Sequence, residues 1–419
     1  MQAKTIKGKS PEEIQSALQQ SMEDARPDDP RLNDSVGQAV GRGFKPTLAI
    51  VFISIKQDIK AICDILDKQE ISIFGATSCG EFIDGEISNG EIAILLLDMK
   101  KTDFKILIEN YYGRDAEEVA KVMGLSALES FKNPSFLISN SFEITNIIDF
   151  VSIISGLERA VGSHLTIWGG NAGDDRIFDH SLVFTNHQCL QTGTILLVID
   201  GDKIKMKGQA AFGWKPAGTM RTVTRSDKDS IYTIDNEPAL DIVFKFLGLK
   251  LTKEEAEKFN PGSASLCIMR EDGSTVMRNA NSYNWDEKSI AVAGKIEPGT
   301  KFRFALPPDF EVVETVTNDA QQIRDTEFPD ADALVMFSCV SRPDELGPMV
   351  STEIDGVKNI FNAPMVGFFT YGEYGRATNG KNEFHNTTCC WVALKEKNHP
   401  PPNGGIMYLN KTKYESKIN

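Results

Sequence analysis

The sequence lacks the segments that cross or enter a membrane. It has no run of eighteen or more apolar residues, the length that spans a bilayer as a helix. Its start, MQAKTIKGKSPEEIQ, has no apolar stretch of the kind found in a secretory signal. Its seven cysteines are an odd number and include no CxxC pair, which disfavours a four-thiolate zinc site and a disulfide framework. We therefore expect a cytoplasmic protein that makes no membrane contact.

Several catalytic and nucleotide-binding motifs are also missing. There is no HExxH, no pair of histidines at helical spacing and no CxxCH for covalent haem attachment. The stretch GGNAGDDR lacks the Gly-Lys-Ser/Thr ending of a phosphate-binding loop and the GxGxxG spacing of a dinucleotide site. No Gly-x-Ser-x-Gly motif of a serine hydrolase occurs. These absences leave a binding protein as a better hypothesis than an enzyme.

Positive charge is in short supply. The chain of 419 residues has 45 Lys and Arg against 59 Asp and Glu, a net charge of −14. A nucleic-acid-binding protein usually carries a basic face, so we expect no nucleic-acid partner. The composition is 41% hydrophobic and 25% charged, as in a globular protein with a substantial core. At this length, two or three packed units are expected.

One order of elements recurs three times along the chain: an apolar strand, an amphipathic helix, and a strand that ends in glycine and an acid. The three final strands are IFGATSCGEF, TIWGGNAGDD and MVGFFTYGEYG. Such recurrence predicts an internal structural repeat of strand-helix-strand units. The predicted fold class is α/β, or mixed α+β, with mixed sheets covered by helices and two sub-domains.

Other segments fit this scheme. Ser10-Pro11-Glu12-Glu13 is a capping box that predicts a helix through IQSALQQSMED. Four segments between the second and third occurrences, from SLCIMR to KFRFALP, predict an antiparallel meander. Cys389 and Cys390 are neighbours in the predicted strand of TTCCWVAL, so at most one of them is expected to point inward.

The acids at the three strand ends are candidate binding residues. A glycine can adopt a positive φ and re-aim the next side chain, and ligands of open α/β sheets sit at strand ends. Glu81, Asp174 and Glu373 therefore qualify. The alternative is that each acid only accepts backbone N–H bonds within its own turn.

Three further residues belong to the same argument. Arg342, at the end of the strand FSCVSR, suits a ligand carboxylate or pairs with Glu373. Cys339 in the same strand is a nucleophile only if a base lies beside it. His385 in EFHNTT is the best-placed histidine for a non-covalent haem, or it simply forms a hydrogen bond in a turn.

Together these motifs resemble the FIST domains. GATSCGEF, WGGNAGDD, LVFTN and PALDIVFKFLG are similar to the N-terminal FIST domain, and VMRN, FSCVSR, GFFTYGEYG and FHNTT to the C-terminal one. The resemblance covers about residues 48–394. It implies a division into an N-terminal helix and linker (1–47), a FIST N domain (48–247), a FIST C domain (248–395) and a polar tail (396–419).

The resemblance also implies a function. FIST domains are thought to bind small molecules, with amino acids proposed, and to signal to kinases, cyclases or chemoreceptors. We therefore expect a sensory protein, not an enzyme, that signals through a separate partner such as a histidine kinase or a cyclase. Some bacterial members bind haem and sense nitric oxide, so haem b with His385 as its ligand is an alternative. A Cys339-dependent enzyme and a pure interaction scaffold stay open.

The family pattern can be carried over to this chain residue by residue. In the middle motif it touches Gly170, Asn171, Gly173 and Asp174, and in the C-terminal half Cys339, Arg342, Gly372, Glu373, His385 and Asn386. We predict that a ligand binds where the strand ends meet, with Tyr371 as part of an aromatic wall. The predicted ligand-binding residues are Glu81, Asn171, Asp174, Cys339, Arg342, Tyr371, Glu373 and Asn386.

Overall fold

Three similar units form the body of the molecule. A computed structural model describes residues 1–23, 43–143, 150–256, 264–270, 273–307, 309, 311–376 and 380–397. Residues 24–42 of the predicted linker and nearly all of the predicted tail fall outside these residues. No helix in the described ranges is long and apolar enough to cross a membrane.

The first two units follow each other along the chain. The first contains β1 (Gln2–Gly8), α1 (Pro11–Glu23), β2 (Leu48–Ile53), α2 (Ile59–Asp67), β3 (Ser72–Thr77), β4 (Glu81–Ile83), β5 (Glu86–Ser88) and β6 (Ile92–Asp98). The second contains β7 (Phe104–Asn110), α3 (Ala116–Ser130), β8 (Pro134–Asn140), α4 (Phe150–Val161), β9 (Thr166–Gly170), β10 (Val183–Phe184), β11 (Cys189–Leu190) and β12 (Gly193–Asp200).

The third unit has the same order but is interrupted after its first strand. It contains β13 (Ile204–Ala211), α7 (Glu311–Thr326), β21 (Ala333–Cys339), α8 (Arg342–Leu346), α9 (Met349–Phe361), β22 (Met365–Thr370), β23 (Glu373–Arg376), β24 (Asn382–His385) and β25 (Cys389–Glu396). The recurring order confirms the mixed α/β fold class and the internal repeat predicted from sequence.

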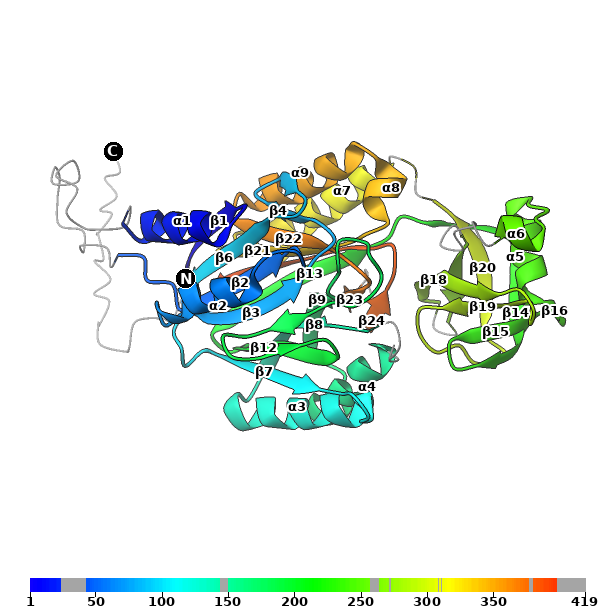
Figure 1. Cartoon of the computed structure of the whole chain (residues 1–419), viewed down its shortest axis with the longest axis horizontal. Coiled ribbons are helices and arrows are strands. Elements are labelled where there is room, and N and C mark those ends of the chain that lie inside the picture. The colour runs from blue at the N-terminus through cyan, green and yellow to red at the C-terminus, as the bar shows by residue number, and fades with distance from the viewer. Residues whose placement is uncertain are drawn as a thin grey trace, which may run out of the picture.

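Residues 215–306 interrupt the third unit, and we call them the β insertion. They form β14 (Lys215–Asp227), β15 (Ser230–Ile234), β16 (Glu237–Pro238), α5 (Ala239–Leu247), α6 (Lys253–Ala256), β17 (Ser265–Met269), β18 (Thr275–Asn284), β19 (Ser289–Val292) and β20 (Lys301–Leu306). Strands β17, β18 and β19 are a meander as predicted, whereas β20 returns to pair with β17 and β14. The insertion has its own apolar core and lies to one side of the body (Figure 1).

Each unit builds one sheet on the same plan. Its second strand pairs in parallel with its third strand and antiparallel with its last strand, as β2 does with β3 and β6. The hairpin that follows the third strand leaves for a neighbouring sheet. Hairpin β4–β5 joins β22, hairpin β10–β11 joins β3, and hairpin β23–β24 joins β9. The three units therefore exchange hairpins in a closed cycle.

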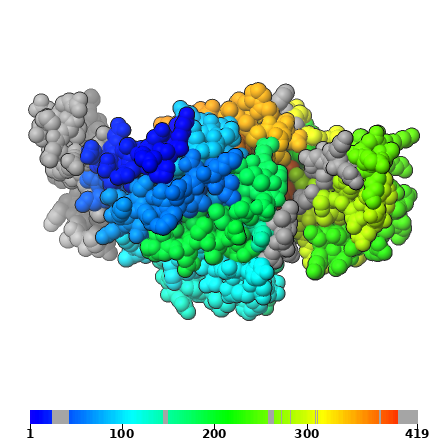
Figure 2. Space-filling view, viewed as in Figure 1, coloured from blue at the N-terminus to red at the C-terminus, as the bar shows by residue number. Residues whose placement is uncertain are grey.

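Both faces of each sheet are buried. The inner faces share one apolar core, and the outer faces pack under separate helix pairs: α1 with α2, α3 with α4, and α7 with α9. In the space-filling view the first unit (blue) lies toward the left and the β insertion (green to yellow) at the right end of the molecule, with the α3 region (cyan) at the bottom (Figure 2). Burial of both faces corrects the prediction for Cys389 and Cys390: both are fully buried, Cys389 under the helices and Cys390 in the inner core.

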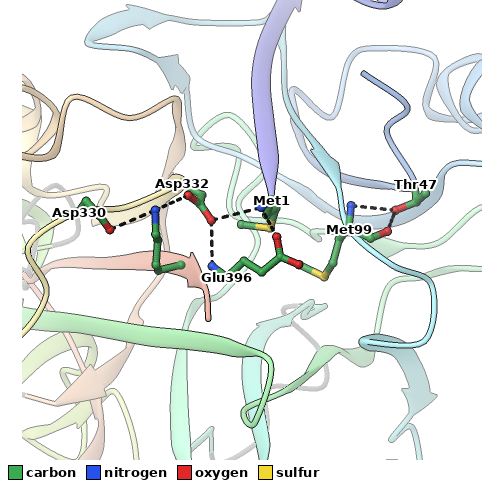
Figure 3. A network of polar contacts seen from close by, with 7 residues as sticks. Met1, Thr47, Met99, Asp330, Asp332 and Glu396 are labelled. Atoms are coloured by element: carbon green, nitrogen blue, oxygen red, sulfur yellow. Dashed lines mark hydrogen bonds and ion pairs between the residues drawn. The ribbon is translucent and has the colours of Figure 1, made fainter. Parts of the chain in front are cut away.

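A strand that the sequence analysis missed, β1, ties the first unit to the third. β1 pairs antiparallel with β6, and its polar sequence QAKTIKG gave no apolar alternation. The Met1 amino group contacts the carboxylates of Asp332, at 3.6 Å, and Glu396 (Figure 3). Lys395 joins the same network through Asp332. These contacts lie at the end of the sheets opposite the glycine-acid turns.

Candidate functional site

The turns that follow the third strand of each unit are called here the first tip (78–81), the second tip (171–182) and the third tip (371–373). The first and third tips have the same backbone conformation. Gly80 and Gly372 both have φ of +119°, which L-residues rarely adopt. A β-carbon at Gly372 would collide with the ring of Phe384. The turn directs the following acid, Glu81 or Glu373, into the interior, where each is fully buried.

Equivalent donors hold these two carboxylates. One donor is a hydroxyl three residues earlier in the chain, and the other is the backbone N–H of the residue just before the unit's last strand. Glu81 accepts hydrogen bonds from Ser78 Oγ and from Glu91 N, the latter at 3.1 Å. Glu373 accepts hydrogen bonds from Thr370 Oγ1 at 2.5 Å and from Thr388 N at 3.2 Å. The capping alternative predicted backbone N–H donors within the acid's own turn, but the backbone donors here lie 10 residues after Glu81 and 15 residues after Glu373.

Burial changes the protonation of both acids. It raises the pKa of Glu81 to about 7, in spite of the hydrogen bonds from Ser78 and Glu91. It also raises the pKa of Glu373 above its ordinary value, against the hydrogen bonds from Thr370 and Thr388. Two interior carboxyl groups therefore titrate close to neutral pH. Carboxyl pKa values shifted this far are found mainly at functional sites and in buried structural networks.

The second tip differs from the other two. In the sheets, three hairpin residues occupy the same position opposite a third strand. These pairs are Glu81 with Phe368, Glu373 with Gly170, and Val183 with Ala76. The sequence comparison predicted that Asp174 is the counterpart of the two glutamates. This prediction is wrong, because the second tip is a longer loop and Val183 takes that position. The Asp174 carboxylate accepts hydrogen bonds from Phe178 N, at 3.0 Å, and Asp179 N, at 2.7 Å, inside that loop.

Tyr371 connects the third tip with the second. Its hydroxyl donates a hydrogen bond to Asp174 Oδ1 at 2.6 Å. Its ring stacks on Phe178, with centroids 4.8 Å apart, and meets the edge of Phe142. Asn171 adds a backbone link, because its N–H donates to Gly372 O at 2.8 Å. Tyr371, Asp174 and Asn171 are thus brought together, as the sequence analysis expected of residues at meeting strand ends.

Arg342 has a partner that the sequence analysis did not identify. Its guanidinium forms a bidentate ion pair with Glu353 on α9, with Nε 2.7 Å from Oε2. It also donates to the carbonyl oxygens of Phe212, at 3.2 Å, and Thr387, at 3.1 Å. Both side chains of the ion pair are buried, so the proposed pairing of Arg342 with Glu373 is replaced by one with Glu353. Arg342 also begins α8 and does not end a strand.

Several buried polar groups surround Glu373. The Cys339 thiol stabilises its charged form, and burial raises the pKa of Cys339 well above that of an ordinary thiol. His385 lies opposite Glu373 in the β23–β24 ladder. Ser338 Oγ is buried without a hydrogen-bond partner among the described residues, but it faces the helices together with Cys389, on the other side of β21 from Cys339. His385 Nδ1 and Asn386 Oδ1 are also buried and have no hydrogen-bond partner among the described residues. A group of such atoms marks a place where another molecule, a water or a ligand, completes the hydrogen bonding.

Not every predicted residue belongs to this group. Cys339, Glu373, Asn386 and His385 lie around the third tip, whereas Glu81 belongs to a different sheet edge. Ser338 and Thr388 were missed by the sequence analysis. The spacing of a hydroxyl three residues before each glutamate, in TSCGE and FFTYGE, was a signal that could have identified Ser78 and Thr370.

The surroundings of His385 do not fit a haem. The imidazole is 1% exposed, and its Nε2 lies 3.4 Å from Gly375 O. Burial lowers its pKa to about 3, so the ring is neutral. A hollow of about 960 Å³ beside β24 is lined by Lys381 but not by His385. Among the described residues, no group of three or more His, Cys, Asp or Glu side chains could hold a metal ion.

Comparison with known proteins gives a clear assignment for most of the chain. Residues 47–237 match the family model of the FIST N domain, and residues 239–376 match that of the FIST C domain. Strand pairs that join the two matched segments, such as β4 with β22 and β9 with β23, show that they fold together. No curated protein matches the chain.

Proposed function

The chain belongs to the FIST family, and on that premise we propose that it is a sensory protein that binds an amino-acid-like small molecule at the third tip. FIST domains are sensory domains, which supports the general role. The proposal adds a site, around Glu373, and a ligand class. It also adds a separate signalling partner, such as a histidine kinase or a cyclase, as the family's mode of action implies.

The observation that carries the proposal is the group of buried, unpartnered polar atoms beside Glu373. A buried polar group without a hydrogen bond costs about 1–3 kcal/mol, so the unpartnered atoms of His385 and Asn386 together represent a substantial penalty. The equivalent first tip carries no such atoms among the described residues. The two tips would differ in this way if a ligand binds only at the third tip and supplies the missing hydrogen bonds there.

The chemistry of these atoms favours an ammonium group over a carboxylate. His385 is neutral, and its Nε2 faces a carbonyl oxygen, so Nε2 carries the proton and Nδ1 accepts. Asn386 Oδ1 accepts as well, and Glu373 accepts when it is ionised. Arg342, the residue suited to a ligand carboxylate, is already engaged by Glu353. The α-amino group of an amino acid fits this acceptor-rich site.

Ligand-dependent thermal stability tests the proposal. We expect one or more of the common amino acids, or a simple alkyl amine, to raise the melting temperature of the wild type. Glu373→Gln and Asn386→Ala should lose the effect. Glu81→Gln is the matched control, because it makes the same change at the equivalent first tip and should keep it. An unchanged response in Glu373→Gln, or no response to any of these compounds, would overturn the proposal.

The alternatives have weaker support. A haem and nitric-oxide sensor would require His385, which is buried, to become accessible to a haem. A Soret band that disappears in His385→Ala would support this alternative. For a cysteine-dependent enzyme, the raised pKa of Cys339 keeps its thiol protonated, which disfavours nucleophilic attack. We therefore propose a binding protein without catalytic activity.

A further inference from the structure

A second site follows from a hollow between the β insertion and the body. Its volume is about 960 Å³, within the usual range for small-molecule sites. Most of its wall comes from β17, β18 and residues 295–301 of the insertion. The body contributes Val151 of α4 and Lys381, which precedes β24. In Figure 1 the insertion stands beside the part of the body that holds α4 and β24.

The charge of this hollow is opposite to that of the protein. Of the described residues, five cations and a single acid line it, which gives this part of the wall a net charge of +4 in a chain whose net charge is −14. The lining charges are Arg270, Arg278, Lys295, Lys301, Lys381 and Glu297. Glu297 contacts Lys295 at 2.5 Å and Glu383 contacts Arg270 at 2.8 Å, so protein carboxylates balance part of this charge. Like charges repel, so a bound anion would stabilise the remaining concentration of cations.

Two of the cations are fixed in place. Arg278 is 3% exposed and donates to Phe384 O at 2.6 Å, across the boundary between insertion and body. Arg270 pairs with Glu383 at 2.8 Å across the same boundary. Lys301 and Lys381 are exposed and stand on opposite sides of that boundary. An anion between them would contact both parts of the molecule.

The rest of the wall is aliphatic. The aliphatic side chains that line the hollow are Val151, Ile268, Val276, Ile296, Met220 and Met269, and no aromatic side chain among the described residues does so. A ring that binds by stacking therefore finds no platform, whereas an alkyl chain finds apolar contacts. We propose that the hollow binds a small organic anion with phosphate or carboxylate groups on an aliphatic body. This site does not depend on the amine site at the third tip.

Calorimetric titration of the full chain with hexyl phosphate tests the inference, with inorganic phosphate and hexanoate as comparisons. Hexyl phosphate should bind at least about tenfold more tightly than inorganic phosphate, because its chain is buried. It should also bind more tightly than hexanoate if the site favours the double charge, and less tightly if it favours a carboxylate. Raising the salt concentration should weaken binding of all three.

The paired variant Lys301→Glu/Lys381→Glu should reduce the affinity for hexyl phosphate at least about tenfold. The control Lys68→Glu/Lys100→Glu, an equal charge change at two exposed positions outside the hollow, should leave it nearly unchanged. An equal loss in this control would show that only the net charge matters and would overturn the site. So would the absence of binding, or hexyl phosphate binding no better than inorganic phosphate.

Discussion

At the scale of single residues, the two glycine-glutamate pairs have the same backbone conformation and the same kind of hydrogen-bond donors. Gly80 and Gly372 share a φ of +119°, and Glu81 and Glu373 share the same arrangement of donors. The capping alternative does not distinguish them, because the backbone donors of both carboxylates lie outside their own turns. What separates the two acids is their neighbours: the unpartnered atoms of His385 and Asn386 lie at the third tip only, among the described residues.

The buried carboxyl of Glu81 should make stability depend on pH. Its pKa is raised from 4.5 to about 7, so between these values the folded protein keeps a proton that the unfolded chain has released. The contribution of Glu81 to stability is full below pH 4.5 and falls as pH rises to 7, by up to roughly 3 kcal/mol. In urea denaturation across this window, Glu81→Gln should lose that part of the slope.

The exposed Glu129, at the end of α3, provides the control for this prediction. Glu129→Gln should keep the pH dependence of the wild type, because this side chain is exposed to water in the folded protein as it is in the unfolded chain. If Glu81→Gln has the same slope as the wild type, Glu81 does not carry the interior proton.

At the scale of elements, the exchanged hairpins hold the units together, and the Arg342–Glu353 pair joins elements within the third unit. Strands β3 and β22 each have a glycine where the aromatic of an incoming hairpin packs: a β-carbon at Gly75 would meet Phe184, and one at Gly367 would meet Phe82. Arg342 similarly joins α8 to α9 and to the carbonyl groups before β25 and after β13. Contacts of this kind bring together elements that lie far apart in sequence.

Removal of Arg342 alone should be strongly destabilising. Arg342→Met leaves the Glu353 carboxylate buried without its partner, at a cost of about 3–5 kcal/mol. The double variant Arg342→Met/Glu353→Leu removes both charges and should recover a large part of that loss. Urea denaturation of the wild type, both single variants and the double variant measures the coupling. A double variant no more stable than Arg342→Met would contradict the assigned pair.

At the scale of the whole molecule, the body and the β insertion have separate apolar cores. The body's inner core is shared by all three sheets, whereas that of the insertion is made by β15, α5 and β17 to β20. The family-domain boundary, between residues 237 and 239, and the predicted boundary at 247–248 both fall within the insertion. The spatial division is therefore not the division along the chain.

Separate cores should give separate unfolding. Phe302 in β20 and Phe337 in β21 are both fully buried, one in each core. We expect Phe302→Ala to speed amide hydrogen exchange in the insertion alone, and Phe337→Ala to speed it across the three sheets of the body, since each change costs about 3–5 kcal/mol in its own core. Mass spectrometry of peptic fragments measures this. Faster exchange of the body strands in Phe302→Ala would show one cooperative unit.

The sequence by itself determined the elements and their recurrence. Apolar periodicity, glycines and capping residues act over a few neighbours, so strands such as IFGATSC and helices such as the one after Ser10 could be predicted locally. The same local signals identified the glycine-acid turns and the family. They also selected most of the residues that gather at the third tip.

Only the tertiary structure decided which elements meet. The exchange of hairpins, the partner of Arg342 and the burial of both Cys389 and Cys390 depend on contacts between distant segments, which no local pattern encodes. The basic hollow is a further case, because its cations are spread from Arg270 to Lys381 and become a cluster only when the insertion docks on the body. Which charges lie close together depends on the fold, so the chain's net charge of −14 gave no indication of this basic cluster.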